Sequence, residues 1–541
     1  MNNSIRFSAR TKVILFSLLI MLGLIFRYPT TPHEIGWDSF TVHLMANSIS
    51  EFGYAKWWLH PASVIGWYPY SSVSAVPFLL SGISQCTGID VERVILLYSM
   101  FLGIFSIFGA YLMAGAMWNN DIFKFLVAIV FSASQGIITF STWTAHSRTL
   151  FVISLPLFIY LLLRTRTFKV RFGILTFIIL ALLIVTHHYI YFTIPIIISY
   201  IIIAMIYKSG KYIKSVRIPE NIASFTVFAG FLIMFSIPFF TRTLMEADPA
   251  MSRSGGGRYI WLFYMIQSYA RYIGILIILV VSGYIYLLFK RNKRFEEWFL
   301  LLCLISLAQF LYIMTYMKWF ILPFASLLIG IALTNVAIAG LRKNMSIEKR
   351  KYAISFVIIF LLLSAIFTGY YQYLHFLNDP DPYKRYMEER TYIGALWIKD
   401  NINREEKLLA ESRISERMFS ISEVPTLVGE PVDIAYGFVD PKKLDVRRIY
   451  SFTSIEFYFH DPYKAVNRTV DTKTKWAAGA ILRSDINNRY GWACRLTSLF
   501  NLSYFIENRD FSNRFSESVQ QTKNLCYDNG KVRVWLLKEN S

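Results

Sequence analysis

The sequence has little charge for its length. Of its 541 residues, 17% are charged, against roughly 25% in an ordinary soluble domain. Cysteine is scarce as well, and the four residues present exclude a small scaffold held together by disulfides. The 27 glycines and the 17% aromatic content exclude a collagen-like or a disordered chain. The sequence also lacks a P-loop, a dinucleotide-binding fingerprint, a serine-hydrolase elbow and an HExxH zinc motif.

Apolar residues, in contrast, make up 55% of the chain. They form eleven segments, which lie at roughly 11–26, 93–117, 122–140, 149–163, 172–186, 191–207, 221–240, 273–289, 299–316, 320–341 and 353–371. Several of them approach the roughly 20 residues that a helix needs to cross a bilayer. The pattern predicts a multi-pass α-helical membrane protein with about 11 transmembrane helices. We expect the first helix to be retained and not cleaved as a signal peptide.

Lysine and arginine are concentrated in alternate loops. The chain holds 55 Lys and Arg against 35 Asp and Glu, a net charge of +20. The N-terminus and the loops near 118–124, 164–171, 208–220, 290–297 and 342–351 hold 21 basic and 5 acidic residues, a net of +16. The opposite loops and the region after the last span each hold a net of +2. By the positive-inside rule, the N-terminus is cytoplasmic and residues 372–541 are extracytoplasmic. The charge therefore orients the protein in the cell membrane and predicts no nucleic-acid partner.

Two regions follow from this pattern. Residues 1–371 form a transmembrane domain with two long outer loops, at 27–92 and 241–272. Residues 372–541 form a soluble α/β domain, with a helix at 386–401 and strand-like runs at 407–410, 478–482, 502–506 and 532–537. Cys494 and Cys526 both lie in this second domain. Outside the reducing cytoplasm, a disulfide between them is preferred over two free thiols.

The first outer loop carries two acids just after the first helix, Glu34 and Asp38. A carboxylate among aromatic and apolar neighbours at the mouth of a helical bundle is costly unless it is paired or metal-bound. Asp38 is therefore a candidate metal ligand, or a general base that deprotonates an acceptor. The alternative is a helix cap, because Asp-Ser before an apolar run is a common helix start.

The second outer loop combines an acid, two arginines and three consecutive glycines. Glu246 is followed by Arg253, the glycines at 255–257, and Arg258. A glycine hinge lets a loop move over a substrate, and arginines pair well with phosphate. The alternative is a flexible connector whose charges are solvated.

Isolated cations and histidines complete the set of candidates. Lys318, between two apolar spans, is either an interface anchor or a phosphate contact. The same choice applies to Arg27, Arg148 and Arg271. His146 and the pair at 187 and 188 can bind metal in principle, but neither has the spacing of a zinc cluster, and an interfacial polar turn is the preferred interpretation of both.

These motifs, in this order, resemble the catalytic subunit of oligosaccharyltransferase, a membrane glycosyltransferase of the GT-C class. The loop from His33 to Asp38, followed by Gly66-Trp67-Tyr68-Pro69, resembles the first outer loop of that family. Thr243-Leu244-Met245-Glu246 is similar to the motif on the mobile loop of the family, and Lys318 falls where the family has a lipid-phosphate arginine. Ala395 to Asn401 is similar to the helix that links the two domains in the family.

The sequence departs from the family at two places, one that concerns the metal ligands and one that concerns the acceptor. Residues 141–149 contain no acid, although the family has metal ligands there, so His146 is a candidate substitute. The Trp-Trp-Asp-Tyr-Gly motif that reads the acceptor sequon is replaced by Ala410-Glu411-Ser412-Arg413-Ile414.

The resemblance implies a GT-C-like fold and transfer of a sugar or oligosaccharide to an acceptor at the extracytoplasmic face. It implies a polyprenyl phosphate or pyrophosphate donor of the dolichyl type, held in the lipid bilayer, and leaves open a protein, lipid or glycan acceptor. It implies Asp38 and Glu34 as catalytic acids, and Lys318, Arg258 and Arg253 as contacts of the donor phosphate. If a divalent metal such as Mg²⁺ or Mn²⁺ takes part, its ligands are Asp38, Glu246 and His146.

The alternatives to a glycosyltransferase are a transporter or flippase for a polar lipid, and an inactive scaffold of the same fold. A transporter is expected to show broken half-helices, and the sequence indicates no such pair.

Overall fold

The computed structural model divides into two compact units. It describes residues 5–53, 75–166, 170–209, 220–246, 257–340, 347–377, 386–410, 412–428, 438, 456–457, 489–509 and 523–538. The first unit, here called the helical unit, comprises Met1–Tyr28, Ser99–Thr142 and Ser147–Leu374. The second, here called the sheet unit, comprises Pro29–Tyr98, Trp143–His146 and His375–Ser541. The sheet unit therefore contains the first predicted outer loop as well as the C-terminal region.

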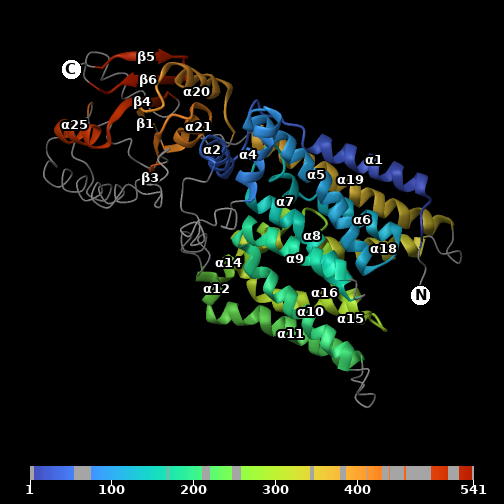
Figure 1. Ribbon diagram of the computed structural model, residues 1–541. Coiled ribbons are helices and arrows are strands. Elements are labelled where there is room, and N and C mark those ends of the chain that lie inside the picture. The colour runs from blue at the N-terminus through green and yellow to red at the C-terminus, as the bar shows by residue number, and fades with distance from the viewer. Residues whose placement is uncertain are drawn as a thin grey trace. The chain divides into compact units, whose positions relative to one another are not determined.

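The helical unit is built from helices of very different lengths (Figure 1). Those before the second predicted outer loop are α1 (Ala9–Phe26), α5 (Val91–Met117, from Ser99 onward), α6 (Asp121–Ser132), α7 (Gln135–Ile138), α8 (Ser147–Thr165), α9 (Val170–Thr186), η2 (His188–Phe192), α10 (Thr193–Ser209) and α11 (Glu220–Thr241). Those after it begin with α12 (Thr243–Glu246) and continue with α14 (Arg258–Ile273), α15 (Ile277–Phe289), α16 (Phe295–Ala308), η3 (Gln309–Tyr312), α17 (Met314–Phe320), α18 (Leu322–Gly340) and α19 (Ile347–Leu377).

Close helix contacts hold this unit together. α18 packs against both α6 and α15, and α16 packs against both α10 and α11. The crossing of α15 and α18 depends on Gly283, because a Cβ at that position would collide with the backbone of Leu328. Small residues allow helices to approach this closely, and in membranes such approaches replace the hydrophobic effect as the source of packing energy.

The length and composition of the helices make this a multi-pass membrane protein. Among the described residues, six helices are long and apolar enough to cross a membrane, or up to eight if each bent pair is one span. Large apolar side chains on these helices are exposed, such as Phe225 on α11, at 69%. A soluble protein would bury surfaces of this kind. The other three predicted segments lie on α6, α9 and α19. Of these, α6 ends after 12 residues, and α9 and residues 354–368 of α19 are shorter apolar helices.

Two of the spans are bent, which the sequence did not indicate. α14 and α15 meet at an angle of 96°, and α17 and α18 meet at 46°. Gly274 lies at the first break with a φ of +87°, a left-handed conformation that glycine adopts without strain. The sequence places the boundary between the outer loop at 241–272 and the apolar segment at 273–289 beside this break, but a hydropathy boundary does not give the angle between the two helices.

The sheet unit contains a mixed six-stranded sheet in the order β3-β2-β1-β4-β6-β5 (Figure 1). Its strands are β1 (Lys407–Ala410), β2 (Thr426–Val428), β3 (Glu456–Phe457), β4 (Leu502–Asn508), β5 (Leu525–Asp528) and β6 (Val532–Leu536). β1 is parallel to both β2 and β4, and the other pairs are antiparallel. Its helices are α2 (Trp37–Phe52), α4 (Ala75–Thr87), α20 (Glu389–Asn401), α21 (Ser412–Ser422) and α25 (Arg489–Phe500).

The core of this unit joins the first predicted outer loop to the C-terminal region. Phe40 of α2 is fully buried and belongs to one hydrophobic cluster with Ile398 of α20, Met418 of α21 and Val534 of β6. The predicted helix and three of the four predicted strands are present, and the strand predicted at 478–482 lies outside the described residues. Strong apolar runs in these segments explain the agreement.

The predicted disulfide is not formed. Cys494 lies on α25, which packs against β4, whereas Cys526 lies on the edge strand β5. β6 separates β4 from β5, and the structure joins neither cysteine in a disulfide.

Candidate functional site

The sheet unit contains a buried network of histidines and carboxylates around the start of α2. The Nδ1 atom of His33 lies 2.8 Å from Oε1 of Glu92, and its Nε2 atom lies 3.0 Å from Oε2 of Glu389. The imidazole also stacks on the ring of Tyr392, with centroids 3.9 Å apart. Burial alone would lower the pKa of His33, but the two carboxylates outweigh this effect and raise it. Because both ring nitrogens face carboxylates, His33 fits this position as an imidazolium that donates on both sides.

Glu34 forms the second pair of this network with His43. Its carboxylate is fully buried and lies 2.9 Å from Nδ1 of His43, while the hydroxyl of Ser39 donates to it at 3.4 Å. Burial would lower the pKa of His43, but the charge of Glu34 outweighs burial and the pKa is raised. Ser39 also accepts a hydrogen bond from the backbone of Ala145. Glu34 is therefore enclosed on all sides in this structure, which suits a positioning residue more than a catalytic one.

Asp38 has very different surroundings from Glu34, although it follows Glu34 by only four residues. Its side chain is 59% exposed, and its Oδ2 atom lies 3.3 Å from Nδ1 of His146. The N-cap of α2 is Gly36, so Asp38 lies in the first turn and the helix-cap alternative does not hold. Gly36 has a φ of +100°, and a Cβ there would lie 3.0 Å from Nε2 of His146. A glycine is therefore required for His146 to approach Asp38.

The predicted metal ligands do not form a metal site among the described residues. Asp38 and His146 face each other, but in the described ranges no three His, Cys, Asp or Glu side chains gather closely enough to hold an ion. Glu246 ends α12, and its side chain lies outside what is described. The rings of His187 and His188 are 4.0 Å apart and pack against Tyr189. Aromatic packing explains this pair without a metal.

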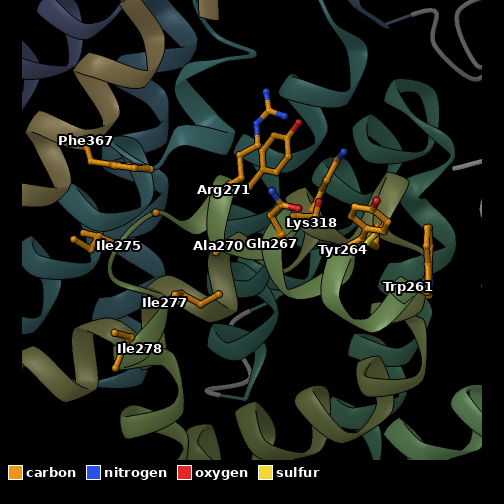
Figure 2. Close-up of a pocket in the computed structure, with 14 residues that line it drawn as sticks. Trp261, Tyr264, Gln267, Ala270, Arg271, Ile275, Ile277, Ile278, Lys318 and Phe367 are labelled. Atoms are coloured by element: carbon orange, nitrogen blue, oxygen red, sulfur yellow. The ribbon is translucent and has the colours of Figure 1, made fainter. Parts of the chain in front are cut away.

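The helical unit contains a cavity of about 950 Å³ at the break between α14 and α15. Its lining combines cationic, aromatic and apolar side chains (Figure 2). None of the described residues that line it is an aspartate or a glutamate. A pocket lined by two cations and a large apolar surface suits an amphipathic anion.

Two cations occupy the polar part of this pocket. Lys318 and Arg271 both line it, and in Figure 2 both side chains point toward the top of the view. The Nζ atom of Lys318 lies 4.7 Å from the ring centroid of Tyr272 and 4.4 Å from that of Trp319. The guanidinium of Arg271 lies 5.9 Å from the ring of Tyr272. Aromatic faces attract cations, and such contacts hold a charge in place without neutralising it.

The opposite part of the pocket is apolar. It is lined by Ile275, Ile277 and Ile278 at the start of α15 and by Phe367 of α19, all drawn on one side of the cations in Figure 2. The N-cap residue of α15 is Leu276, which makes no side-chain capping bond. The positive end of the α15 dipole therefore adds to the charge of the two cations.

The other predicted phosphate contacts lie elsewhere or outside the described residues. Arg258 begins α14, thirteen residues before Arg271, which is about 20 Å along a helix. Its guanidinium lies 5.7 Å from the ring of Phe239, and it does not line the pocket. Arg253 lies outside the described residues. The structure thus brings Lys318 together with Arg271 and not with Arg258.

Arg27 has a structural role. Its guanidinium is buried and donates to the hydroxyl of Ser141 at 2.8 Å and to the carbonyls of Gly23 and Ser132 at 3.0 and 3.1 Å. All of these acceptors belong to the helical unit. A side chain engaged in this way is not available to a substrate.

The sequence did not single out every residue of the pocket and of the histidine network. Tyr264, Gln267 and Arg271 line the pocket from α14 at spacings of three and four residues, which place them on one helical face. That polar stripe on an otherwise apolar helix was a usable signal. Glu92 and Glu389 gave none, because they meet His33 only through the tertiary fold.

Comparisons with known proteins show the fold. No family model matches the sequence, and no curated protein matches it. The apo oligosaccharyltransferase of Archaeoglobus fulgidus superposes with a TM-score of 0.60 at 10% identity, covering 93% of this chain and 70% of that chain. The archaeal oligosaccharyltransferase AglB from Archaeoglobus fulgidus, in complex with an inhibitory peptide and a dolichol-phosphate, gives 0.58 at 12% identity over the same shares. ArnT from Cupriavidus metallidurans bound to undecaprenyl phosphate gives 0.55 at 11% identity and covers 98% of both chains. These are GT-C glycosyltransferases, and the predicted GT-C-like membrane fold is confirmed.

Proposed function

We propose that the chain is a membrane glycosyltransferase that transfers a sugar or oligosaccharide from a polyprenyl phosphate or pyrophosphate to an acceptor at the extracytoplasmic face. The observation that carries this proposal is the pocket at the α14–α15 break. Its cations, Lys318 and Arg271, match a phosphate, and its wall of Ile275, Ile277 and Phe367 matches an isoprenoid chain. The archaeal and bacterial enzymes of the same fold, solved with dolichol-phosphate and undecaprenyl phosphate, support this choice of donor.

The role of the two cations follows from the chemistry of transfer. When the bond between the sugar and the phosphate breaks, negative charge develops on the departing phosphate oxygen. Lys318 and Arg271 stabilise that charge, and the start of α15 adds its dipole. Their ring contacts orient them before the donor arrives, so little reorganisation accompanies the reaction.

Asp38 is the candidate general base. Its exposed carboxylate accepts a proton from the acceptor, and the acceptor atom then attacks the anomeric carbon while the phosphate leaves. His146 orients the carboxylate, and the buried pair of Glu34 and His43 holds the start of α2 on which Asp38 lies. We derive no step through a metal, since the described ligands do not form a site for one.

Reconstituted protein with a polyprenyl-linked sugar tests the proposal. We expect mass spectrometry to detect free polyprenyl phosphate or pyrophosphate and a glycosylated acceptor from a mixture of peptides, lipids and glycans. The D38N variant is the matched control, because it should bind the donor without consuming it.

The same assay separates the alternatives. The 96° break at Gly274 is a feature that transporters also use. A transporter would move the labelled lipid between leaflets without cleaving the bond between the sugar and the phosphate. A protein that binds the donor but neither cleaves nor moves it would be a scaffold, and this result would refute the proposed activity.

A further inference from the structure

A second, smaller cavity lies in the helical unit, where α5, α8 and α16 meet. It has a volume of about 250 Å³, and its lining residues are Ala116, Leu163, Arg164, Arg166 and Glu296. The proposed donor pocket shares none of these residues. Two guanidinium groups therefore face a space large enough for a phosphate, apart from the proposed active site.

Aromatic rings hold both arginines in place. The guanidinium of Arg164 lies 5.5 Å from the ring of Tyr160. That of Arg166 lies 4.7 Å from the ring of Phe295 and 5.5 Å from that of Tyr207. An arginine stacked on a ring has lost much of its rotamer freedom already, so it loses less when it binds a ligand. The cavity is therefore preorganised for an anion.

The charge of the cavity also favours an anion. Nη1 of Arg166 lies 3.2 Å from Oε1 of Glu296, and this one contact engages a small part of a group with five N–H donors. The lining carries two positive charges against one negative charge.

The position of the cavity indicates where the anion comes from. Arg164 lies in the last turn of α8, which is one of the six helices long and apolar enough to cross a membrane. The end of such a span lies at the level of the lipid headgroups. Loop 164–171 belongs to the side predicted to be cytoplasmic, where anionic lipids are enriched.

We propose that Arg164 and Arg166 form a binding site for the phosphate of an anionic phospholipid headgroup. The two guanidinium groups pair with the phosphate oxygens, and Leu163 and Ala116 contact the glycerol end of the lipid. The acyl chains lie along the exposed apolar surface of the neighbouring helices. The site is independent of the proposed transfer reaction and serves to anchor this end of the helical unit.

Lipid retention after purification tests the site. The full-length protein and the R164Q/R166Q double variant are delipidated in detergent and then mixed with vesicles of phosphatidylglycerol or of phosphatidylcholine. R171Q/K208Q is the matched control, because it removes two exposed cations of the same predicted face that do not line the cavity. Bound lipid is counted by native mass spectrometry. Thermal unfolding in the same detergent checks that each variant is folded.

We expect the wild-type protein to retain phosphatidylglycerol in preference to phosphatidylcholine, and the R164Q/R166Q variant to retain at least about tenfold less, because two charge-assisted bonds are lost. The control should stay within about twofold of wild type, since it removes no such bond. Equal retention by the wild-type protein and R164Q/R166Q would overturn the site. Inorganic phosphate forms the third arm. If it stabilises the wild-type protein but not the double variant, while neither lipid is preferred, the site binds free phosphate and the assignment to a lipid is wrong.

Discussion

The pocket of the helical unit and the histidine network of the sheet unit hold charge in opposite ways. In the pocket, the cations Lys318 and Arg271 contact aromatic rings, and none of the described residues that line the cavity is an acid. In the network, Glu34 and Glu92 each face a histidine within 3 Å. A charge beside a ring remains able to attract a ligand, whereas a buried carboxylate paired with an imidazolium does not.

The network repeats this contrast within a single loop. Glu34 is fully buried and paired with His43, while Asp38 is 59% exposed and lies 3.3 Å from His146. We therefore propose different roles for these two acids. Glu34 would stabilise the fold, and Asp38 would act on the acceptor. The predictions below test that division, from the largest expected effect to the smallest.

The largest effect should come from D38N. The substitution keeps the size of the side chain and removes the base, so we expect the rate of sugar transfer to fall by at least about 100-fold. The unfolding temperature should not change, because the side chain is exposed. D90N is the matched control, since Asp90 is also half-exposed and pairs with a neighbouring cation, Arg93. Full activity of D38N would remove the central catalytic assignment.

The next largest effect should come from the pocket. R271Q and K318Q each remove one positive charge that the pocket presents to the donor phosphate. We expect each substitution to lower kcat/KM for the donor by about tenfold or more. The loss should appear in kcat as well as in KM, because the two cations also stabilise the charge that develops on the departing phosphate. R258Q removes a cation from the other end of the same helix and should have little effect. A larger loss with R258Q than with R271Q would show that the donor binds elsewhere.

E34A should affect stability more than chemistry. It leaves the charged His43 buried without its carboxylate, and we expect the free energy of unfolding to fall by about 1–3 kcal/mol. Thermal unfolding of E34A and D38N side by side is the measurement. An unchanged midpoint for E34A would contradict the structural role.

The smallest effect is a dependence of stability on pH. The pKa values of His33 and His43 are raised above their ordinary value of 6.5. Their contribution to stability is therefore fully present below about pH 6.5 and is lost as the pH rises through the folded-state values. We expect the unfolding temperature to fall on this alkaline side, and the H33Q/H43Q variant to show a flatter profile. A wild-type protein whose stability increases over that range would contradict the charged state of these histidines.

Much of the fold follows from the sequence, because it depends on patterns within single segments. The eleven apolar runs all lie on helices, and the strand-like runs at 407–410 and 502–506 are strands. The angles of the breaks were not foreseen, since the boundary between the predicted loop at 241–272 and the predicted span at 273–289 does not determine how α14 and α15 are oriented. β2 and β5 have only three and four residues, which is too short for a pattern, and pairing with neighbouring strands stabilises them.

The site was less predictable, because it depends on burial and on contacts between distant segments. The sequence places Glu34 and Asp38 together, yet in the fold Glu34 is buried beside His43 and Ser39 while Asp38 is 59% exposed. Arg258 and Arg271 look alike as helix-end cations. Only Arg271 lines the pocket, because it lies beside the break between α14 and α15, whereas Arg258 lies at the other end of α14.

Equilibrium binding of an unsubstituted polyprenyl phosphate tests the division of tasks most directly. The wild-type protein, R271Q/K318Q and D38N would be compared in the same detergent by isothermal titration calorimetry. We predict that R271Q/K318Q loses at least about tenfold in affinity, while D38N binds like the wild-type protein. Wild-type affinity in R271Q/K318Q, or an equal loss in D38N, would contradict the assignment of the α14–α15 pocket as the donor site.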